Sequence, residues 1–483
     1  MTVPGWTITA IFFADLAIRI GLSVRVVMRR RPVGVSLAWL FVILVFPFAG
    51  AAIYLLIGEL RIGRRRTERA RELEVPYALW IGELSEAFAV DWSAHSEAAA
   101  LLARLAQSAT RVPALPGNEL ELIADWREAF VALIRDIDAA TQTCHLEFYI
   151  WEPGGDADAV AEALIRASRR GVLCRVLLDA VGSGNFLRSK LASRMRAEGV
   201  RLESALAGGL FHMLVTRFDL RMHRKIVVID SEIGYTGSMN LVDPRLFKQG
   251  LRIGQWVDAI ARLRGPAVEA LAVTFLADWN LEHEDGLEAL RSDEVRRPAA
   301  RQGPTVQVIP TGPTMEGDAI QILLTTIYAA RRTLTITTPY FVPDEALLTA
   351  LVSAARRGVE VELIVPERVD SLLVRLASQP HMGELLTNGV KVMLFRGGLL
   401  HTKSIIADGE ISLFGSLNLD PRSIYLNFEI TLAVYDRAFA AELERLQSQY
   451  AAAAAPMNLA DWQSRSMYKR FIDNVARLLS PLL

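Results

Sequence analysis

The sequence predicts a duplicated α/β domain, with two β-α-β-rich halves packed together, preceded by an N-terminal hydrophobic helical hairpin. Three observations support this prediction. The order apolar strand, turn, amphipathic helix, Arg-Arg-Gly, apolar strand occurs within 144–180 and again within 333–366. A polar motif of the form His-x-Lys follows each of these two segments. An uncharged stretch at 36–58 lies near the N-terminus.

The composition excludes several classes of protein. Of the 483 residues, 52% are hydrophobic, which is too many for a chain that stays disordered. The chain has only two cysteines, so it is not a disulfide-stapled secreted domain. Cys144 and Cys174 lie in apolar strand patterns that predict buried free thiols. The net charge of −1 argues against a protein that coats nucleic acid.

Residues 1–60 are predicted to form the membrane hairpin. The stretch 36–58 contains no charged side chain. At about 1.5 Å per residue, a helix of that length crosses a hydrocarbon core of about 30 Å. The stretch 7–28 is less apolar, although Asp15 and Arg19 are spaced to pair on one face of a helix.

Two membrane topologies are compatible with this hairpin. Basic residues flank the second stretch on both sides, and the larger group adjoins the main domain, which places that domain on the cytoplasmic side. A shallow hairpin that never fully crosses the bilayer also satisfies both groups, because Pro32, Pro47 and Gly50 permit a bend. The flanking residues are Arg29, Arg30, Arg31, Arg61, Arg64, Arg65, Arg66, Arg69 and Arg71.

The rest of the chain divides at changes in its pattern. We expect a helical connector at 61–117, a first half at 118–298 and a second half at 299–460. Arg-Arg-Gly marks the helix end in each half, and the β-α-β order predicts a largely parallel sheet. The segment 461–483 is amphipathic and basic. It fits a helix in an anionic membrane interface and a helix packed on the protein body equally well.

The candidate site residues recur at identical spacing in the two halves. A single His-x-Lys is a weak signal, but six identities repeated within one chain are a strong one. The first set is His223, Lys225, Asp230, Gly237, Ser238 and Asn240, and the second is His401, Lys403, Asp408, Gly415, Ser416 and Asn418.

Strand geometry predicts that these side chains share one face. Residues two apart in a strand point to the same side, so the histidine and lysine of each motif lie together, as do the serine and asparagine. The Asp-Gly at 408–409 signals a two-residue hairpin turn. Such a turn places His401 opposite Ser416 and, in the other half, His223 opposite Ser238.

This combination of groups suits a phosphodiester, whose oxygens need cations and hydrogen-bond donors. Two histidines indicate covalent catalysis. One imidazole attacks phosphorus, and the other protonates the leaving alkoxide and then deprotonates the incoming hydroxyl. We expect no metal ion and no other cofactor, because the two lysines neutralise the charge that a divalent ion otherwise would, and no metal-ligand spacing occurs.

The twin His-x-Lys-(x)4-Asp motifs resemble those of the phospholipase D superfamily. A closer resemblance, to the bacterial cardiolipin synthases, is carried by LLHTKSIIADGEISLFGSLNLDPRSIYLNFEI, TTPYFVPDEALL, YTGSMNLVDPRLFKQG and the arginine-rich N-terminal segment. It covers essentially the whole chain. It implies an inner-membrane enzyme that converts two phosphatidylglycerol molecules into cardiolipin and glycerol, with one active site between the two halves.

The resemblance also implies roles for individual residues. His223 and His401 are the implied nucleophile and general acid/base, and the first is favoured as nucleophile. His212 lies in an apolar loop where either core packing or acyl-chain contact fits. The implied phosphate-binding residues are Lys225, Lys403, Asn240 and Asn418, assisted by Ser238 and Ser416.

Four carboxylates and one arginine complete the expected site. Asp230 and Asp408 lie at the hairpin turns, so we expect a structural role for them despite their place in the motif. The resemblance implies that Glu429 orients the imidazole of the second motif and that Asp258 orients that of the first. Arg422 fits either a contact with a lipid phosphate or a structural ion pair.

Three classes of function remain open: a transphosphatidylase, a phospholipase D-type phosphodiester hydrolase that uses water, and a non-catalytic membrane scaffold. Two intact motifs disfavour the scaffold. A nuclease does not need the hydrophobic hairpin and gains from a basic groove that the net charge does not suggest, so we expect membrane lipids and no nucleic acid as partners. Water exclusion at a membrane-facing mouth favours transfer over hydrolysis. The oligomeric state stays open.

Overall fold

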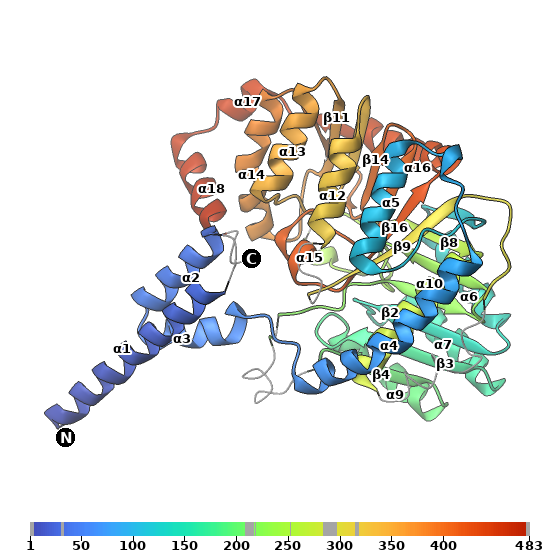
Figure 1. The fold of residues 1–483 in the computed structure, drawn as a ribbon, viewed down its shortest axis with the longest axis horizontal. Coiled ribbons are helices and arrows are strands. Elements are labelled where there is room, and N and C mark those ends of the chain that lie inside the picture. The colour runs from blue at the N-terminus through green and yellow to red at the C-terminus, as the bar shows by residue number, and fades with distance from the viewer. Residues whose placement is uncertain are drawn as a thin grey trace.

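The structure is a computed structural model that describes residues 4–29, 33–207, 217, 219–251, 253–283, 297–313 and 318–479. His212 and the end of the C-terminal segment, 480–483, lie outside the described residues. Figure 1 shows an α/β body from which a helical hairpin projects on one side. The predicted duplicated α/β fold is confirmed, since each half forms its own mixed sheet.

The N-terminal hairpin differs from the prediction in its second arm. The chain turns at 46–48, where Pro47 lacks a backbone donor and Phe48 has φ 52°. The continuous helix predicted at 36–58 is therefore wrong. In the part of the chain that the structure describes, no helix combines the length and apolar composition needed to cross a membrane. The elements are α1 (Gly5–Met28), α2 (Val33–Val45), α3 (Ala49–Ile53) and a π-helical turn, η1 (Tyr54–Gly58).

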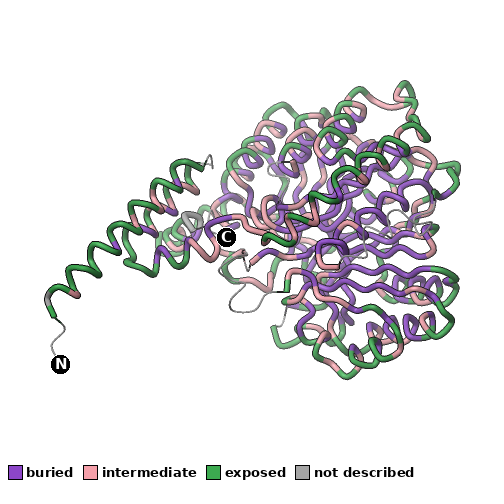
Figure 2. The backbone as a smooth tube through the Cα atoms, turned by 60° about the horizontal axis from the view of Figure 1, so that its bottom comes forward, coloured by how far each residue is buried: buried purple, intermediate pink, exposed green. Residues whose placement is uncertain are grey.

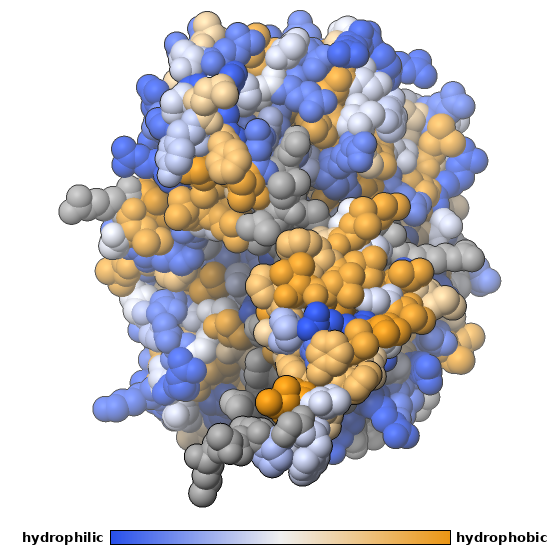
Figure 3. All heavy atoms as spheres, turned by 90° about the vertical axis from the view of Figure 1, so that its left-hand side faces the viewer, coloured by the Kyte–Doolittle hydropathy of each residue, from blue (hydrophilic) through white to orange (hydrophobic). Residues whose placement is uncertain are grey.

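Polar groups inside the hairpin hold this bend. Asp15 and Arg19 form the predicted ion pair, and Asp15 also accepts a hydrogen bond of 3.0 Å from the amide of Phe48. Arg25 bonds to the buried carboxylate of Glu59 at 2.7 Å. Outside these contacts the hairpin exposes many apolar side chains, and Figure 3 shows them gathered on the face from which the hairpin projects.

The first half is a seven-stranded sheet in the order β1-β8-β6-β5-β2-β3-β4. Only β2, β3 and β4 run parallel to one another, because only they are joined by helical crossovers. The other pairs are antiparallel. The strands are β1 (Glu119–Ile123), β2 (Thr143–Phe148), β3 (Leu173–Asp179), β4 (Arg201–Ala205), β5 (Ile226–Ile229), β6 (Ile233–Gly237) and β8 (Ile260–Arg264).

The second half repeats this plan in the order β17-β12-β11-β10-β14-β15-β16-β9, with β10, β11 and β12 parallel. The prediction of largely parallel sheets is thus wrong, because the motif strands form antiparallel meanders beside a short parallel core. The strands are β9 (Thr305–Thr311), β10 (Thr333–Thr337), β11 (Glu360–Pro366), β12 (Lys391–Phe395), β14 (Ser404–Ala407), β15 (Ile411–Gly415), β16 (Glu429–Tyr435) and β17 (Ala454–Pro456).

Helices cover both faces of each sheet (Figure 1). The predicted Arg-Arg-Gly ends are confirmed, because α7 and α13 are each followed by a glycine with positive φ, Gly171 and Gly358. The outer helices are α6 (Trp126–Asp138), α7 (Asp156–Arg169) and α9 (Lys190–Ala197) in the first half, and α12 (Asp318–Ala329), α13 (Glu345–Arg356) and α14 (Leu372–Thr387) in the second. Short helices are α8 (Gly184–Leu187), η4 (Gln249–Leu251) and α15 (Pro421–Tyr425).

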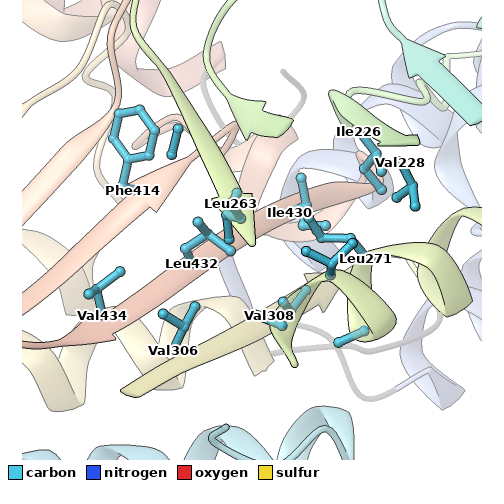
Figure 4. Packing of buried hydrophobic residues seen from close by; sticks show 14 of the residues in the cluster. Ile226, Val228, Leu263, Leu271, Val306, Val308, Phe414, Ile430, Leu432 and Val434 are labelled. Atoms are coloured by element: carbon cyan, nitrogen blue, oxygen red, sulfur yellow. The ribbon is translucent and has the colours of Figure 1, made fainter. Parts of the chain in front are cut away.

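A large hydrophobic core lies between the two halves. Side chains from both sheets interdigitate there with α10 (Ala267–Glu282) and α16 (Arg437–Ala452), and Figure 4 shows Ile226 and Val228 of the first half beside Ile430 of the second. Figure 2 shows the buried backbone continuing through this boundary. The halves therefore form one packed body rather than two separable domains.

The segments that flank the two halves pack on both of them. In the connector, α4 (Arg64–Ala87) packs on α10, and after the short η2 (Trp92–Ala94) α5 (Glu97–Thr110) packs on α12 and β9. At the C-terminus, α17 (Leu459–Gln463) precedes α18 (Met467–Leu479), which packs on α14. One face of α18 thus covers the protein body, whereas Met467, Tyr468 and Phe471 are exposed. Cys144 and Cys174 are buried free thiols, as predicted.

Candidate active site

Backbone pairing across the boundary places the two histidines. His223 leads into β5, and its amide donates to the carbonyl of Phe428 in the second half at 2.9 Å. His401 leads into β14, and its amide donates to the carbonyl of Val257 in the first half at 2.8 Å. Just before His401, β13 (Leu399–Leu400) pairs in parallel with β7 (Trp256–Val257). Each histidine therefore lies beside a strand of the opposite half.

This pairing exchanges the orienting carboxylates. Glu429 follows Phe428 and meets His223, with Oε2 2.7 Å from Nδ1. Asp258 follows Val257 and meets His401, with Oδ1 2.7 Å from Nδ1. The predicted assignment, in which Glu429 serves the second motif and Asp258 the first, is wrong. The reason is that each motif strand is held by the other half at the position of its histidine.

The two serines support the carboxylates. Ser416 Oγ donates to Glu429 Oε2 at 2.5 Å, and Ser238 Oγ donates to Asp258 Oδ1 at 2.6 Å. The predicted register is also wrong by one residue: Ala407 pairs with Ile411 across a three-residue turn, and the first half has the same turn. A serine consequently does not face the histidine of its own half. Each serine instead bonds to the carboxylate that orients the histidine of the opposite half.

The lysines are fully buried between the motifs. Lys225 Nζ donates to the carbonyl of His223 at 2.6 Å, and Lys403 Nζ donates to that of His401 at 2.5 Å. Burial lowers the pKa of Lys225 to about 8 and that of Lys403 to about 7. Each ammonium group lies within electrostatic reach of both orienting carboxylates, Glu429 and Asp258. The positive charge of Lys225 further lowers the pKa of Lys403. The two motifs therefore face a common point.

The two motif asparagines are buried as well. Asn240 Oδ1 accepts a hydrogen bond of 3.1 Å from the amide of Ile150, whereas its Nδ2 is buried with no protein partner. Asn418 Nδ2 donates to Ser423 Oγ at 3.2 Å, and its Oδ1 has no protein partner. A buried amide donor without a partner is costly unless a ligand accepts its hydrogen bond. Asn240 thus fits a site for an anion.

Burial sets the protonation of the paired groups. It lowers the pKa of His223 and His401 to about 4 each, although the neighbouring carboxylates oppose this effect. Burial also works to raise the pKa of Glu429 and Asp258, but the histidine, lysine and serine around each outweigh it and keep both pKa values low. At neutral pH each neutral imidazole therefore donates from Nδ1 to a carboxylate, which leaves the Nε2 lone pair available.

Sequence reasoning missed three residues that contact these groups. The Tyr149 ring lies 4.9 Å from the His223 ring, and the Trp256 ring stacks on His401 at 4.2 Å. Arg224, the middle residue of the first motif, is buried and donates to the carbonyls of Glu429 and Thr311 at 3.0 Å each. The signal for Trp256 was its position two residues before Asp258, which places both side chains on one face of a strand.

The motif aspartates lie at the hairpin turns and bind backbone. Asp230 accepts hydrogen bonds from the amides at 141–143, and Asp408 accepts them from those at 331–333. Arg422 forms an ion pair with Asp219, so the structure bears out the ion-pair alternative for this arginine.

Known proteins are similar to this chain over most of its length. A family model described as "Cardiolipin synthase, PLD-like domain" matches 133–250 and 323–450, and one described as "Phospholipase_D-nuclease N-terminal" matches 17–59. Cardiolipin synthase A of Erwinia tasmaniensis is 43% identical over 484 residues, covering 100% of this chain and 99% of that protein. Cardiolipin synthase A of Yersinia pseudotuberculosis is 44% identical, covering 96% of each.

A solved structure shares the fold. Phosphatidylserine synthase of Haemophilus influenzae superposes with a TM-score of 0.58 at 14% identity, covering 79% of this chain and 100% of that chain. Fold and motifs together define a phosphatidyltransferase of the phospholipase D type. The chain belongs to the cardiolipin synthase family within that class. Its function is accordingly cardiolipin synthesis on phospholipid substrates, and it is a membrane-associated enzyme.

Proposed function

We propose that this enzyme transfers a phosphatidyl group from one phosphatidylglycerol to another through a phosphohistidine intermediate. The observation that carries this proposal is the pair of buried histidines, each with Nδ1 held by a carboxylate of the opposite half at 2.7 Å. Two separately oriented imidazoles suit a reaction that needs a nucleophile and a general acid/base.

The first step forms the intermediate. The reactive form carries a proton on His401 Nε2 and none on His223 Nε2, and the bound phosphodiester anion favours the proton on His401. His223 Nε2 attacks the donor phosphorus, the bond from phosphorus to the headgroup oxygen breaks, and His401 gives this proton to the departing glycerol. Asp258 stabilises the imidazolium form of His401 that delivers this proton. Lys225 and Lys403 balance the negative charge that develops on the phosphate oxygens.

The second step consumes the intermediate. His401, now neutral, removes a proton from the headgroup hydroxyl of the second phosphatidylglycerol. The resulting oxygen bonds to phosphorus, and the bond from phosphorus to His223 breaks, which releases cardiolipin. Glu429 holds His223 through Nδ1 in both steps, so that Nε2 always faces the reaction.

A product analysis tests this proposal. The purified enzyme is incubated with phosphatidylglycerol as the only lipid, in the presence of EDTA, and lipids and glycerol are followed by mass spectrometry. We expect cardiolipin and glycerol in equal amounts. Phosphatidic acid and glycerol without cardiolipin would instead establish the phospholipase D-type hydrolase, and activity that requires added divalent ions would contradict the metal-free mechanism.

We also propose that residues 1–60 hold the enzyme on the bacterial inner membrane with the α/β body, 118–460, on the cytoplasmic side. Support comes from the exposed apolar surface of the hairpin, where Phe12 and Phe41 are each 62% exposed. Double substitution of these residues by Asp in the full chain should release the enzyme from membranes. Val131→Asp, at a residue 66% exposed on the body, is the matched control and should not. Protease accessibility in inverted and right-side-out vesicles tests the orientation.

A further inference from the structure

We propose that Lys248 binds the phosphate of the acceptor lipid, the phosphate that does not react. This inference rests on the proposed function. Phosphatidyl transfer between two anionic phospholipids brings two phosphates into one site, and Lys225 and Lys403 serve only the one whose bond breaks. A second cation is needed at the acceptor side, because two phosphodiester anions in a site of low dielectric repel each other.

Lys248 lies at the correct place for this role. Its Nζ is 5.3 Å from the centre of the Trp256 ring, and the same ring stacks on His401 at 4.2 Å. His401 is the group that takes the proton from the acceptor hydroxyl. In a phosphatidylglycerol headgroup only the glycerol carbons separate this hydroxyl from the phosphate. The Trp256 ring thus contacts the residues at both ends of that distance.

The contacts of Lys248 hold its ammonium group in place and leave it accessible. Nζ pairs with Asp370 of the second half at 2.8 Å, and the other oxygen of Asp370 accepts from Tyr340 at 2.6 Å. The Lys248 side chain is 36% exposed, whereas that of Asp370 is only 7% exposed. An ammonium group has three donors, so a lipid phosphate can bind on the solvent side while the carboxylate holds the lysine in place.

The backbone conformation of Lys248 also indicates that its side chain is held in a particular position. Lys248 has φ 50°, a left-handed conformation that is unfavourable for a residue with a side chain. Its neighbour Phe247 packs edge-on against Trp256 at 4.9 Å. Unfavourable backbone of this kind persists where the surrounding structure holds it, and it concentrates at ligand sites.

Two reactions of the full-length enzyme distinguish binding of the acceptor phosphate from a general effect of Lys248 on catalysis or folding. The first is cardiolipin formation in vesicles of phosphatidylglycerol. The second is the exchange of labelled glycerol into phosphatidylglycerol, which uses the same donor but an acceptor without a phosphate. We expect Lys248→Met to slow the first reaction by roughly tenfold or more, as for a lost hydrogen bond to a charged group, and to leave the second within about twofold. Lys248→Arg should retain most of the first reaction.

The control is Arg396→Gln, which removes one positive charge from a surface pair with Glu367 and should change neither reaction. Parallel loss of both reactions in Lys248→Met, or loss of neither, would overturn the proposal. A selective loss in Arg422→Gln with none in Lys248→Met would also overturn it, because Arg422 acts electrostatically on Tyr149, whose ring lies against His223 rather than His401. Wild-type enzyme that yields only phosphatidic acid would refute the proposed function instead.

Discussion

The surroundings of His223 and His401 share one part and differ in another. Both imidazoles use Nδ1 to bind a carboxylate, and both carboxylates accept from a serine. Behind His223, however, Arg224 is buried in an ion pair with Asp278. The corresponding residue behind His401 is Thr402, whose hydroxyl bonds to the carbonyl of Val257 at 3.3 Å and to the hydroxyl of Tyr450 at 3.1 Å.

The difference indicates which part of the site belongs to each step. The carboxylate, serine and lysine are common to both histidines and therefore serve a need that both share, an oriented imidazole near a phosphate. The unshared parts are the ion pair behind His223 and the geometry of the aromatic neighbour, since Trp256 stacks on His401 whereas the Tyr149 ring is tilted against His223. A fixed backbone suits the nucleophile, which must meet phosphorus at one position. A flat, partly apolar wall suits the side where an acceptor enters.

The largest expected effect follows from replacing either histidine by Ala. Each variant should lose at least about a thousandfold in cardiolipin formation, because both steps use both imidazoles. A donor with an activated leaving group that needs no proton should separate the two roles. With it, His401→Ala should still accumulate labelled phosphatidyl-enzyme in an acid-quenched burst, and His223→Ala should not. A burst in His223→Ala and none in His401→Ala would instead make His401 the nucleophile and His223 the general acid/base.

The orienting carboxylates give the next largest effect, about a hundredfold to ten-thousandfold for Glu429→Gln or Asp258→Asn. With the activated donor, Glu429→Gln should slow the burst because it acts on His223. Asp258→Asn should spare the burst and slow only the later transfer to the acceptor. Orientation of each histidine from within its own half predicts the opposite outcome, so stopped-flow measurement of the burst tests the exchange directly.

The pH dependence distinguishes the two lysines. A lysine is charged below its pKa, so attraction of phosphate should decline as pH rises through about 7 for Lys403 and about 8 for Lys225. On the acid side, kcat/KM should fall as pH drops through about 4, where His223 becomes protonated and can no longer attack phosphorus. Lys403→Arg stays charged at all these values and should move the basic limb to higher pH. An unmoved basic limb would mean that Lys403 does not set it.

The sequence predicted the site residues better than their partners. Repetition of His, Lys and Ser at equal spacing was sufficient to indicate that these residues of the two halves meet, because duplicated halves pack face to face. The exchange of Glu429 and Asp258 was invisible, since it depends on pairing between strands that lie far apart in the chain. The turn at 408–410 was misjudged because Asp-Gly also begins a three-residue loop, and one residue changes the register.

The smallest expected effect concerns the aspartates of the two motifs. Asp230 accepts four hydrogen bonds, from three amides and the hydroxyl of Thr141, and Asp408 accepts three from amides. Replacement by Asn should lower the free energy of unfolding by about 1–3 kcal/mol, more at Asp230 than at Asp408, because the backbone amides at the turn lose a charged acceptor. Urea unfolding measures this difference between the variants.

The same two variants should keep the wild-type kcat when it is measured below their unfolding transitions. The reason is position: each aspartate lies at the turn, and a whole strand, β5 or β14, separates it from its histidine and lysine. A large loss of kcat in Asp408→Asn without a loss of stability would place the aspartate in the chemistry. Normal kcat with lowered stability in both halves would mean that this part of the motif is retained to close the hairpin that presents the other two residues.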